Sequence, residues 1–407
     1  MRITRHRNLG LTLSVLMLGA VSQLPASPVL LDESNVRFVS PRTAAIGGVR
    51  AALADDMSTI FANPAGFRAV ESQFRLTEFT VGVSGPMFTM ASIIAEGLDG
   101  DISDVLSRPE VSDLIASLYA GFSVVGPLSF GYVGNGFGVG VTAGSFFTME
   151  GLGIDTVDLN LYQRLLVSGG YSFLLPPVPD WGGEFAAGFL VKGYLTGRAG
   201  FSSLVLDLPD TLGSLDGDLI LNEPFDVISG LAVDVGLRYW WDDRAAVGLT
   251  VANLIAPAVI NRYATLQGFL DNESPAQRTR ARIPQNLSVG AMYSPELGAL
   301  ERYVTRVTLF ADYRNIIDFW TASEQAENIV LKFAFGTEVT LLEVLDLRFG
   351  FNRGLLAAGL GLDLTFMKLN AAIYGDERST EPGFQSVYNV LLGAEIPLRP
   401  RSRDAES

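Results

Sequence analysis

Hydrophobic and polar residues alternate along most of the chain that follows residue 72. In the segment 303–314, one face carries Tyr303, Thr305, Val307, Leu309, Ala311 and Tyr313, and the other carries Val304, Arg306, Thr308, Phe310, Asp312 and Arg314. A period of two residues indicates a β-strand whose two faces meet different surroundings. Segments of this kind lie near residues 73–83, 119–133, 136–148, 157–175, 183–200, 229–241, 244–255, 284–294, 302–315, 328–337, 345–352, 355–366, 367–375 and 386–397. The pattern predicts an all-β protein of about 14 strands.

A soluble β-sandwich also alternates, so three further features decide between it and a membrane barrel. The polar faces contain little lysine, and aromatic residues gather near strand ends, as in Tyr239-Trp240-Trp241 and Phe319-Trp320. The long connections follow only odd-numbered strands, whereas those after even-numbered strands are short. Short turns on one side and aromatic girdles are typical of outer-membrane barrels, which must close because lipid cannot satisfy open sheet edges. We therefore predict an antiparallel β-barrel over residues 73–398, integral to the cell outer membrane.

The stretch 41–67 has a different pattern, rich in small residues and helical in period. One helix face is formed by Ala44, Ala45, Ile46, Val49, Ala52 and Leu53. Gly47-Gly48 interrupts this helix. Asp55-Asp56 followed by Ser58 then makes a cap for a second short helix.

Asn63-Pro64-Ala65-Gly66 is expected to end this helical stretch. Pro64 pushes Asn63 toward extended geometry, and Gly66 permits a sharp reversal. The run GGVRAALADDMSTIFANPAG, residues 47–66, resembles the N-terminal hatch of the outer-membrane long-chain fatty-acid transporter family, the FadL-like transporters of hydrophobic compounds, including its Asn-Pro-Ala motif. The alternative is a pair of helices packed on an ordinary sheet.

The resemblance implies a helical hatch, residues 23–72, inside the lumen of a 14-stranded barrel. It implies hatch and gating roles for Gly47, Gly48, Asp55, Asp56, Asn63, Pro64, Ala65 and Gly66. In this family the third strand kinks inward and opens a lateral passage through the wall. Gly140 and Gly144 lie on the third strand here, so we expect a kink at these glycines. A phosphate-binding loop is the alternative for this glycine-rich run, but no helix follows it.

The N-terminus has the pattern of a signal peptide. Arg2, Arg5 and Arg7 precede a short apolar core from Leu9 to Val21, and Ala20-Val21-Ser22 offers a cleavage site. We expect residues 1–22 to be removed, with a retained N-terminal anchor as the alternative.

Composition limits the chemistry that the chain can perform. The 407 residues include no cysteine and one histidine, His6, which lies in the expected signal peptide. A Ser-His-Asp triad and a Cys/His metal site are thereby excluded from the mature chain, and no pair of carboxylates stands out. A net charge of −15 without a basic stripe argues against binding of nucleic acid. We expect no enzymatic activity and no cofactor.

Two further segments lie outside the strand pattern. Residues 85–118 are expected to form two or three short helices in the first long loop, which would cap the extracellular mouth. The tail 399–407 is expected to be disordered and periplasmic. This tail continues the chain beyond the last strand. Most bacterial barrels instead end at the last strand, on an aromatic residue that serves as the assembly signal. The barrel-assembly machinery remains an expected partner.

A basic cluster, Arg262, Arg278, Arg280 and Arg282, lies in the loop between the seventh and eighth strands. Its local positive field would capture a fatty-acid carboxylate, since arginine suits bidentate binding. The residues expected to form the acyl groove include Leu266, Phe269 and Leu270. The alternative is a rim that contacts anionic lipid headgroups or is simply solvated.

The function implied by the resemblance is passive uptake of long-chain fatty acids or similar hydrophobic molecules. Extracellular loops would capture the ligand, and a shift of the plug around Asn63, Pro64 and Ala65 would release it. The expected partners are this hydrophobic small molecule and the lipids of the outer membrane. Two alternatives remain: a barrel of the same fold that serves a secretion system, and a general polar porin.

Overall fold

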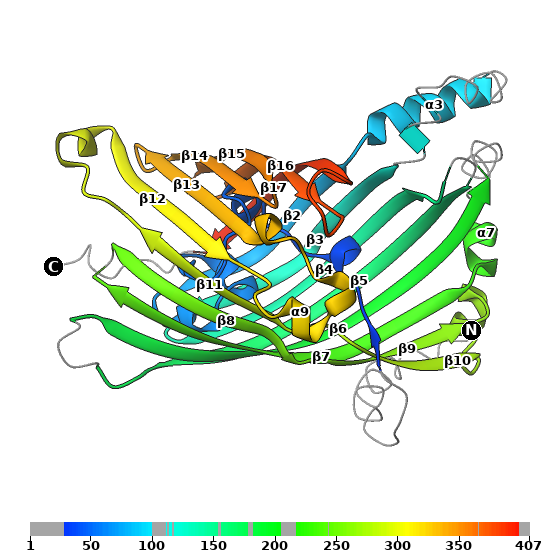
Figure 1. The fold of residues 1–407 in the computed structure, drawn as a ribbon, viewed down its shortest axis with the longest axis horizontal. Helices are drawn as coiled ribbons and strands as arrows, with labels where there is room; N and C mark the ends of the chain where they lie inside the picture. Colours follow the sequence, from blue (N-terminus) through cyan, green and yellow to red (C-terminus); the bar gives the residue numbers. More distant parts are fainter. Residues whose placement is uncertain are drawn as a thin grey trace, which may run out of the picture.

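One antiparallel β-sheet closes on itself to form a barrel (Figure 1). A computed structural model describes residues 28–99, 111, 114–115, 118–153, 156–177, 182–204, 217–242, 244–364 and 366–398. The closed ladder has fourteen strands, because β17 pairs with β2 and β8 pairs with β11. In chain order these strands are β2 (Gln73–Ser84), β3 (Tyr119–Gly134), β4 (Phe137–Gly151), β5 (Thr156–Leu174), β6 (Glu184–Leu204), β7 (Phe225–Trp241), β8 (Ala245–Ile255), β11 (Asn286–Tyr293), β12 (Val304–Tyr313), β13 (Phe333–Leu341), β14 (Leu345–Asn352), β15 (Leu355–Asp363), β16 (Lys368–Glu377) and β17 (Ser386–Leu398). The predicted fold class is confirmed.

Short helical elements occupy the N-terminal segment and the loops. They are η1 (Ser34–Val36), α2 (Pro41–Ala45), η2 (Met57–Phe61), η3 (Pro64–Arg68), α3 (Met87–Asp99), α7 (Gly217–Asn222), α8 (Leu266–Leu270), η5 (Gly298–Arg302), α9 (Asp318–Thr321), η6 (Ser323–Gln325) and η7 (Ile329–Lys332). Within the described ranges, no helix combines the length and the apolar character needed to cross a membrane.

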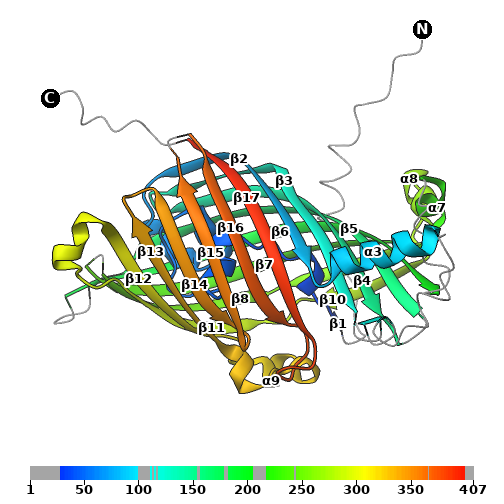
Figure 2. The ribbon, with the colours of Figure 1, turned by 90° about the horizontal axis from the view of Figure 1, so that it is seen from above.

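Strand length differs around the barrel (Figure 2). The strands β3 to β7 have 15 to 21 residues, whereas β11 to β16 have only 8 to 10. Tight turns at Asn135 and Asp242, both with positive φ, connect strands at the end where β2 begins and β17 finishes. Because short turns mark the periplasmic end of such barrels, the long loops lie at the extracellular end.

The outer face of the barrel is a band of exposed apolar side chains. On the long side it includes Phe137, Val139, Val167, Tyr171, Phe189, Val191 and Leu237, and on the short side Phe335, Phe349, Leu360, Ile373, Val390 and Leu392. A closed ladder leaves no open edge in the bilayer, and an exposed apolar band matches lipid rather than water. The protein is therefore an integral outer-membrane β-barrel, as the alternation of polarity predicted.

The N-terminal segment (residues 28–72) runs through the inside of the barrel, where α2 contacts β14 to β17 and η3 contacts β4 to β7. Seven strand glycines make room for its backbone and side chains. A Cβ added at any of them would come within 2.6 Å of an atom of the segment: Gly138, Gly188, Gly236, Gly248, Gly336, Gly350 and Gly359. The segment thus fits against strands from most of the barrel circumference.

Two details of the N-terminal segment differ from the sequence prediction. Val49, Ala52 and Leu53 are buried but not helical, because α2 ends at Ala45 and both Gly47 and Gly48 adopt positive φ. These apolar residues contact Ala246 and Phe310 in the wall, so tertiary packing replaces helical hydrogen bonds. The second difference is that Asn63-Pro64 also starts a new short helix, η3; η2 ends at Phe61 just before it, and Asn63 is extended, as predicted. Gly66 is needed there for space, since its Cβ would lie 2.5 Å from the Cβ of Ala54.

A second sheet region lies above the ladder at the extracellular end. The hairpin of β9 (Pro257–Tyr263) and β10 (Gln277–Arg282) continues β8 and β11 after an irregularity, and β9 pairs with the upper part of β7. On its other side, β10 pairs in parallel with β1 (Val29–Leu30) (Figure 2). The sequence prediction treated 256–283 as a loop, so β9 and β10 were missed, and β1 was missed in the N-terminal segment.

The stretch 329–332 was also predicted incorrectly. It forms the helical turn η7 instead of continuing β13 toward its N-terminus. The cause is a pair of polar contacts. Asn328 caps the turn through Val330 N, and Lys332 Nζ lies 2.5 Å from Asp318 Oδ1.

Candidate functional site in the barrel lumen

Two cavities lie in the lumen on opposite sides of the N-terminal segment. The larger, of about 230 Å³, opens toward the periplasmic end, and the smaller, of about 110 Å³, lies in the extracellular half. Val39 and Val125 line both cavities, so these two valines mark the constriction between them.

The charge of the lining reverses between the two cavities. The lining of the periplasmic cavity includes eight carboxylates against five basic side chains. The extracellular cavity has four arginines, Arg37, Arg50, Arg314 and Arg378, against the single carboxylate of Asp376. The lumen is therefore electropositive above the constriction and electronegative below it.

Arg37 and Arg50 have no acidic partner. Neither forms an ion pair or a side-chain hydrogen bond with any residue in the described part of the chain. Burial inside the barrel, and then the nearby charges of Arg37 and Arg314, lowers the pKa of Arg50 to about 10. Arg314 donates to Asn352 Oδ1 at 2.8 Å, a neutral partner. The carboxylates of Asp312 and Asp234 act in the opposite direction on Arg50 but only partly offset these effects. Guanidinium groups that form no ion pair offer a binding place for an anion.

A separate apolar cluster lies inside the barrel, and none of its residues belongs to the lining of the smaller cavity. Leu166 of β5 and Tyr194 of β6 belong to it, with small residues of the β9–β10 hairpin. Leu31, Phe38 and Phe61 of the N-terminal segment pack against this surface. The N-terminal segment thus covers this apolar surface.

In the periplasmic half, Arg42 joins the N-terminal segment to the wall. Its guanidinium donates to Asp55 and Asp56 of the same segment at 2.6–2.8 Å, and to both carboxylate oxygens of Glu338 of β13 at 2.7 and 2.8 Å. Arg348 of β14 also donates to Glu338, at 2.6 Å. Burial alone would lower the pKa of Arg42, but the three carboxylates outweigh it and raise the pKa.

The residues predicted for the hatch lie close to this junction. Asp56 caps η2 by accepting from Ser58 N at 2.8 Å. Burial acts to raise the pKa of Asp56, but Arg42 and the hydrogen bonds from Ser58 outweigh burial and lower it. Asn63 is fully buried, caps η3 through Ala65 N, and donates to Leu237 O of β7 at 3.0 Å.

The third strand, β4, pairs regularly with one neighbour and irregularly with the other. The pairing of β4 with β5 continues without a break through Gly140 and Gly144, the expected kink positions. These glycines adjoin Ile60 and Phe38 of the N-terminal segment, with hypothetical Cβ distances of 3.3 and 2.9 Å. Pairing is interrupted on both sides of β3: with β2 it stops at Arg75 and resumes at Thr80, and with β4 it stops at Val125, opposite Gly144, and resumes at Ser129, opposite Thr142.

The predicted capture loop is split between two faces. Phe269 of α8 stacks with Phe225 and Tyr263, at ring-centroid distances of 5.1 Å, at the extracellular tip. Arg262 pairs with Asp226. Arg278, Arg280 and Arg282 are exposed and line neither cavity. Leu266 is half-buried and Leu270 is exposed. Capture of a ligand at this loop stays a prediction.

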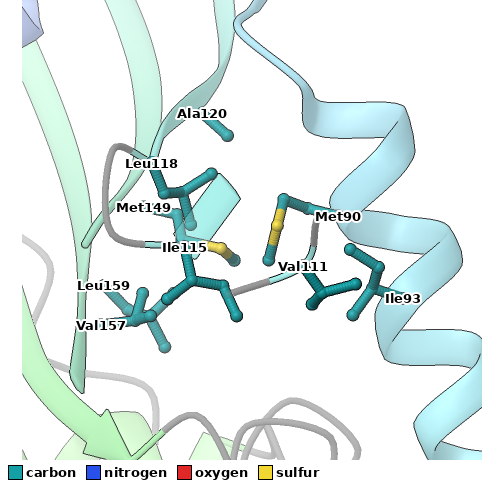
Figure 3. Close-up of a cluster of buried hydrophobic side chains, with 9 residues drawn as sticks. All are labelled: Met90, Ile93, Val111, Ile115, Leu118, Ala120, Met149, Val157 and Leu159. Atoms are coloured by element: carbon teal, nitrogen blue, oxygen red, sulfur yellow. The ribbon is translucent and has the colours of Figure 1, made fainter. Parts of the chain in front are cut away.

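The helical insertion packs on the outside of the wall. Figure 3 shows Met90 and Ile93 of α3 facing Ile115, Leu118 and Met149. Met149 and the exposed Phe137 are both odd-numbered positions of β4, so their side chains point to the same, outer face. The even-numbered positions of β4 face inward and contact the N-terminal segment. The described part of the insertion therefore covers the outer face of the upper wall, in contrast to the cap over the mouth that was expected. Residues 100–110, the expected signal peptide and the tail 399–407 lie outside the described residues.

No protein-family model matches the chain, and no curated protein sequence matches it. Solved structures of other proteins do match the chain in fold. The TodX monoaromatic hydrocarbon channel, in a deltaS2 mutant, is 11% identical with a TM-score of 0.49, over 89% of this chain and 99% of that one. The toluene transporter TbuX of Ralstonia pickettii is 14% identical with a TM-score of 0.46, over 90% of this chain and 100% of that one. A FadL homologue from Pseudomonas aeruginosa is 9% identical with a TM-score of 0.30, over 89% and 98%.

None of these three structures is described as an enzyme. The chain is similar in fold to hydrophobic-compound channels of the FadL family, the family that residues 47–66 resemble in sequence.

Proposed function

We propose that the protein takes up hydrophobic molecules with an anionic head, long-chain fatty acids foremost, passively across the outer membrane. One observation carries the proposal. Four arginines line the extracellular cavity against one carboxylate, and Phe38, the sequence neighbour of Arg37, packs against the apolar cluster of Leu166 and Tyr194. An amphiphile with one carboxylate and a long acyl chain complements both surfaces.

The acyl chain would enter the space now filled by Leu31, Phe38 and Phe61. These side chains belong to the N-terminal segment, so binding displaces them from the surface formed by Leu166 and Tyr194. Burial of apolar area supplies about 0.8 kcal/mol per methylene. A long-chain fatty acid thus offers roughly 10 kcal/mol against the cost of this displacement, whereas a short-chain acid offers too little.

The carboxylate would lie between Arg37 and Arg50. Neither guanidinium forms an ion pair with a carboxylate in the described part of the chain, and placing an anion between them relieves their mutual repulsion. The negative lining of the periplasmic cavity then opposes movement of the ionised ligand past the constriction. Release requires a shift of the plug around Asn63, Pro64 and Ala65, which Asn63 holds to β7 through Leu237 O.

The test is a tryptophan-quenching titration of the refolded barrel with oleate and with its neutral methyl ester. We expect saturable oleate binding that Arg37→Gln/Arg50→Gln weakens at least tenfold, while binding of the methyl ester stays unchanged. The matched control is Arg244→Gln/Arg302→Gln, which removes two arginines at the periplasmic end. Equal affinity of the wild-type barrel for oleate and its ester would refute the role of the arginines.

Bilayer conductance, measured on the same protein, separates the alternative functions. A ligand transporter whose lumen contains the N-terminal segment conducts no steady current. Large open-channel currents without oleate binding would identify a polar porin. A stably co-purifying protein, with neither ligand binding nor current, would identify a partner of a secretion system.

A further inference from the structure

Three arginines form one exposed face of β10. Arg278, Arg280 and Arg282 alternate along the strand with Thr279 and Ala281. Alternate residues of a strand lie about 7 Å apart on the same face. None of the three forms an ion pair with any residue that the structure describes, and Arg282 donates to Thr321 O at 3.1 Å. The strand thus presents three positive charges that no carboxylate neutralises.

The register of the hairpin turns these arginines away from the lumen. Ala281 is buried in the lumen cluster with Leu166 and Tyr194, and it pairs with Ala258 of β9. Side chains of neighbouring strand residues point to opposite faces. The three arginines, which have the other parity, therefore face outward, away from both cavities. This direction separates them from Arg37 and Arg50.

The arginine face begins where the apolar band of the wall ends. Arg282 pairs with Pro257, two residues beyond Ile255, whose side chain is 62% exposed at the end of β8. Next to Arg282, α9 carries Phe319 and Trp320, which are 68% and 76% exposed. Exposed aromatic side chains at the edge of an apolar band mark the depth of the lipid headgroups. Arg282 lies at this depth, and Arg280 and Arg278 follow above it.

The charge of this face contrasts with that of the whole chain. The net charge is −15, so an anionic membrane surface repels most of the protein. Three unpaired guanidiniums at headgroup depth reverse that repulsion locally. Arginine binds phosphate oxygens in a bidentate manner, and it is less strongly hydrated than lysine.

We propose that Arg278, Arg280 and Arg282 bind the phosphate groups of lipids in the outer leaflet. The bound headgroups lie against the outer face of the β9–β10 hairpin, beside Phe319 and Trp320. Because β10 also pairs with β1, the lipid contacts a strand that holds the start of the N-terminal segment. The site is separate from the proposed lumen site and does not depend on it.

The experiment compares two double variants of the full barrel in phosphatidylcholine nanodiscs. Arg278→Gln/Arg280→Gln removes two outward arginines without touching the Arg282 contact, and Arg244→Gln/Arg302→Gln removes two at the periplasmic end. Retention of bisphosphorylated lipid A, of dephosphorylated lipid A and of inorganic phosphate is measured by native mass spectrometry and by titration. We expect the wild-type barrel to retain the phosphorylated lipid in preference to the dephosphorylated one. A basic side chain near an anionic surface contributes about a factor of five, so the first double variant should weaken retention about 30-fold and the control should not.

Three results would overturn the proposal. Equal retention of lipid A with and without phosphates would show that the arginines are not recognised by charge. Binding of inorganic phosphate as tight as that of the lipid would indicate a site for free phosphate. Loss of oleate binding in Arg278→Gln/Arg280→Gln, with lipid retention unchanged, would indicate that these arginines capture the transported ligand instead of binding lipid. Failure of the lumen proposal, by contrast, changes none of the lipid measurements.

Discussion

The substitution Arg42→Met tests whether the N-terminal segment is attached to the wall mainly by charge. Arg42 makes five hydrogen bonds of 2.6–2.8 Å to Asp55, Asp56 and Glu338, and it is 8% exposed. Breaking a buried ion pair by removing one partner costs about 3–5 kcal/mol, since it leaves uncompensated charge. Glu338 keeps its bond to Arg348, so the loss falls on the attachment and not on the strand ladder.

At about 1.4 kcal/mol for each factor of ten, this cost raises the population of the detached segment roughly 200- to 5,000-fold. The chain contains no cysteine, so Ala44→Cys introduces a unique thiol at a position that is 3% exposed on α2. We expect maleimide to label this thiol much faster when Arg42→Met is also present, while the barrel resists unfolding in detergent as before.

The matched control is Arg353→Met, which removes an arginine that bonds Glu327 and Asp376 at the extracellular rim and does not contact the segment. If labelling of Ala44→Cys is equally slow with and without Arg42, the network does not hold the segment. Equal acceleration by both substitutions would mean that labelling reports general loosening of the barrel.

Three further predictions concern the same segment. Gly350→Val places a Cβ about 2.2 Å from Gly47 N, so the segment should shift at a cost of about 1–3 kcal/mol, measured as faster proteolysis of the segment in an intact barrel. Asn63→Ala removes the η3 cap and the side-chain donor to Leu237 O. The attachment of η3 should lose about 2–3 kcal/mol of stability, seen as faster hydrogen exchange across η3. Unchanged exchange would contradict this prediction. The lowered pKa of Asp56 means that its ionised form stabilises the native state above its ordinary pKa. This contribution decreases progressively as the pH falls below about 4 toward the lowered pKa. Proteolysis at pH 3 and pH 7 checks this, with Asp56→Asn expected to reduce the difference.

The strand ladder could be predicted from the sequence because each strand separates two different surroundings. In β12 the exposed Leu309 faces lipid and the positions of Thr308 and Asp312 face the interior, so the period of two is visible in the sequence. The Asn135 turn was equally visible from its glycine neighbours. These signals are local, and a single sequence contains them in full.

The interior contacts depend on pairs that are distant in the sequence, so they were not visible. Gly350 adjoins Gly47 across some 300 residues, and the strand glycines were interpreted as sites of curvature rather than of contact. Arg37 and Arg50 gave no pattern, because their role follows from the path of the segment and not from their spacing. One missed signal was available: in β10, arginines alternate with small residues, which is a strand pattern with a polar outer face.

The reversal of charge along the lumen has an electrical consequence. Two zones of opposite fixed charge in series let ionic current pass more easily at one polarity of the voltage than at the other, as in a semiconductor diode. When the extracellular side is negative, anions enter through the arginine zone and cations through the carboxylate zone, and both accumulate near Val39 and Val125. The opposite voltage depletes the same region of ions. A barrel whose N-terminal segment has been loosened should therefore pass more current when the extracellular side is negative than when it is positive.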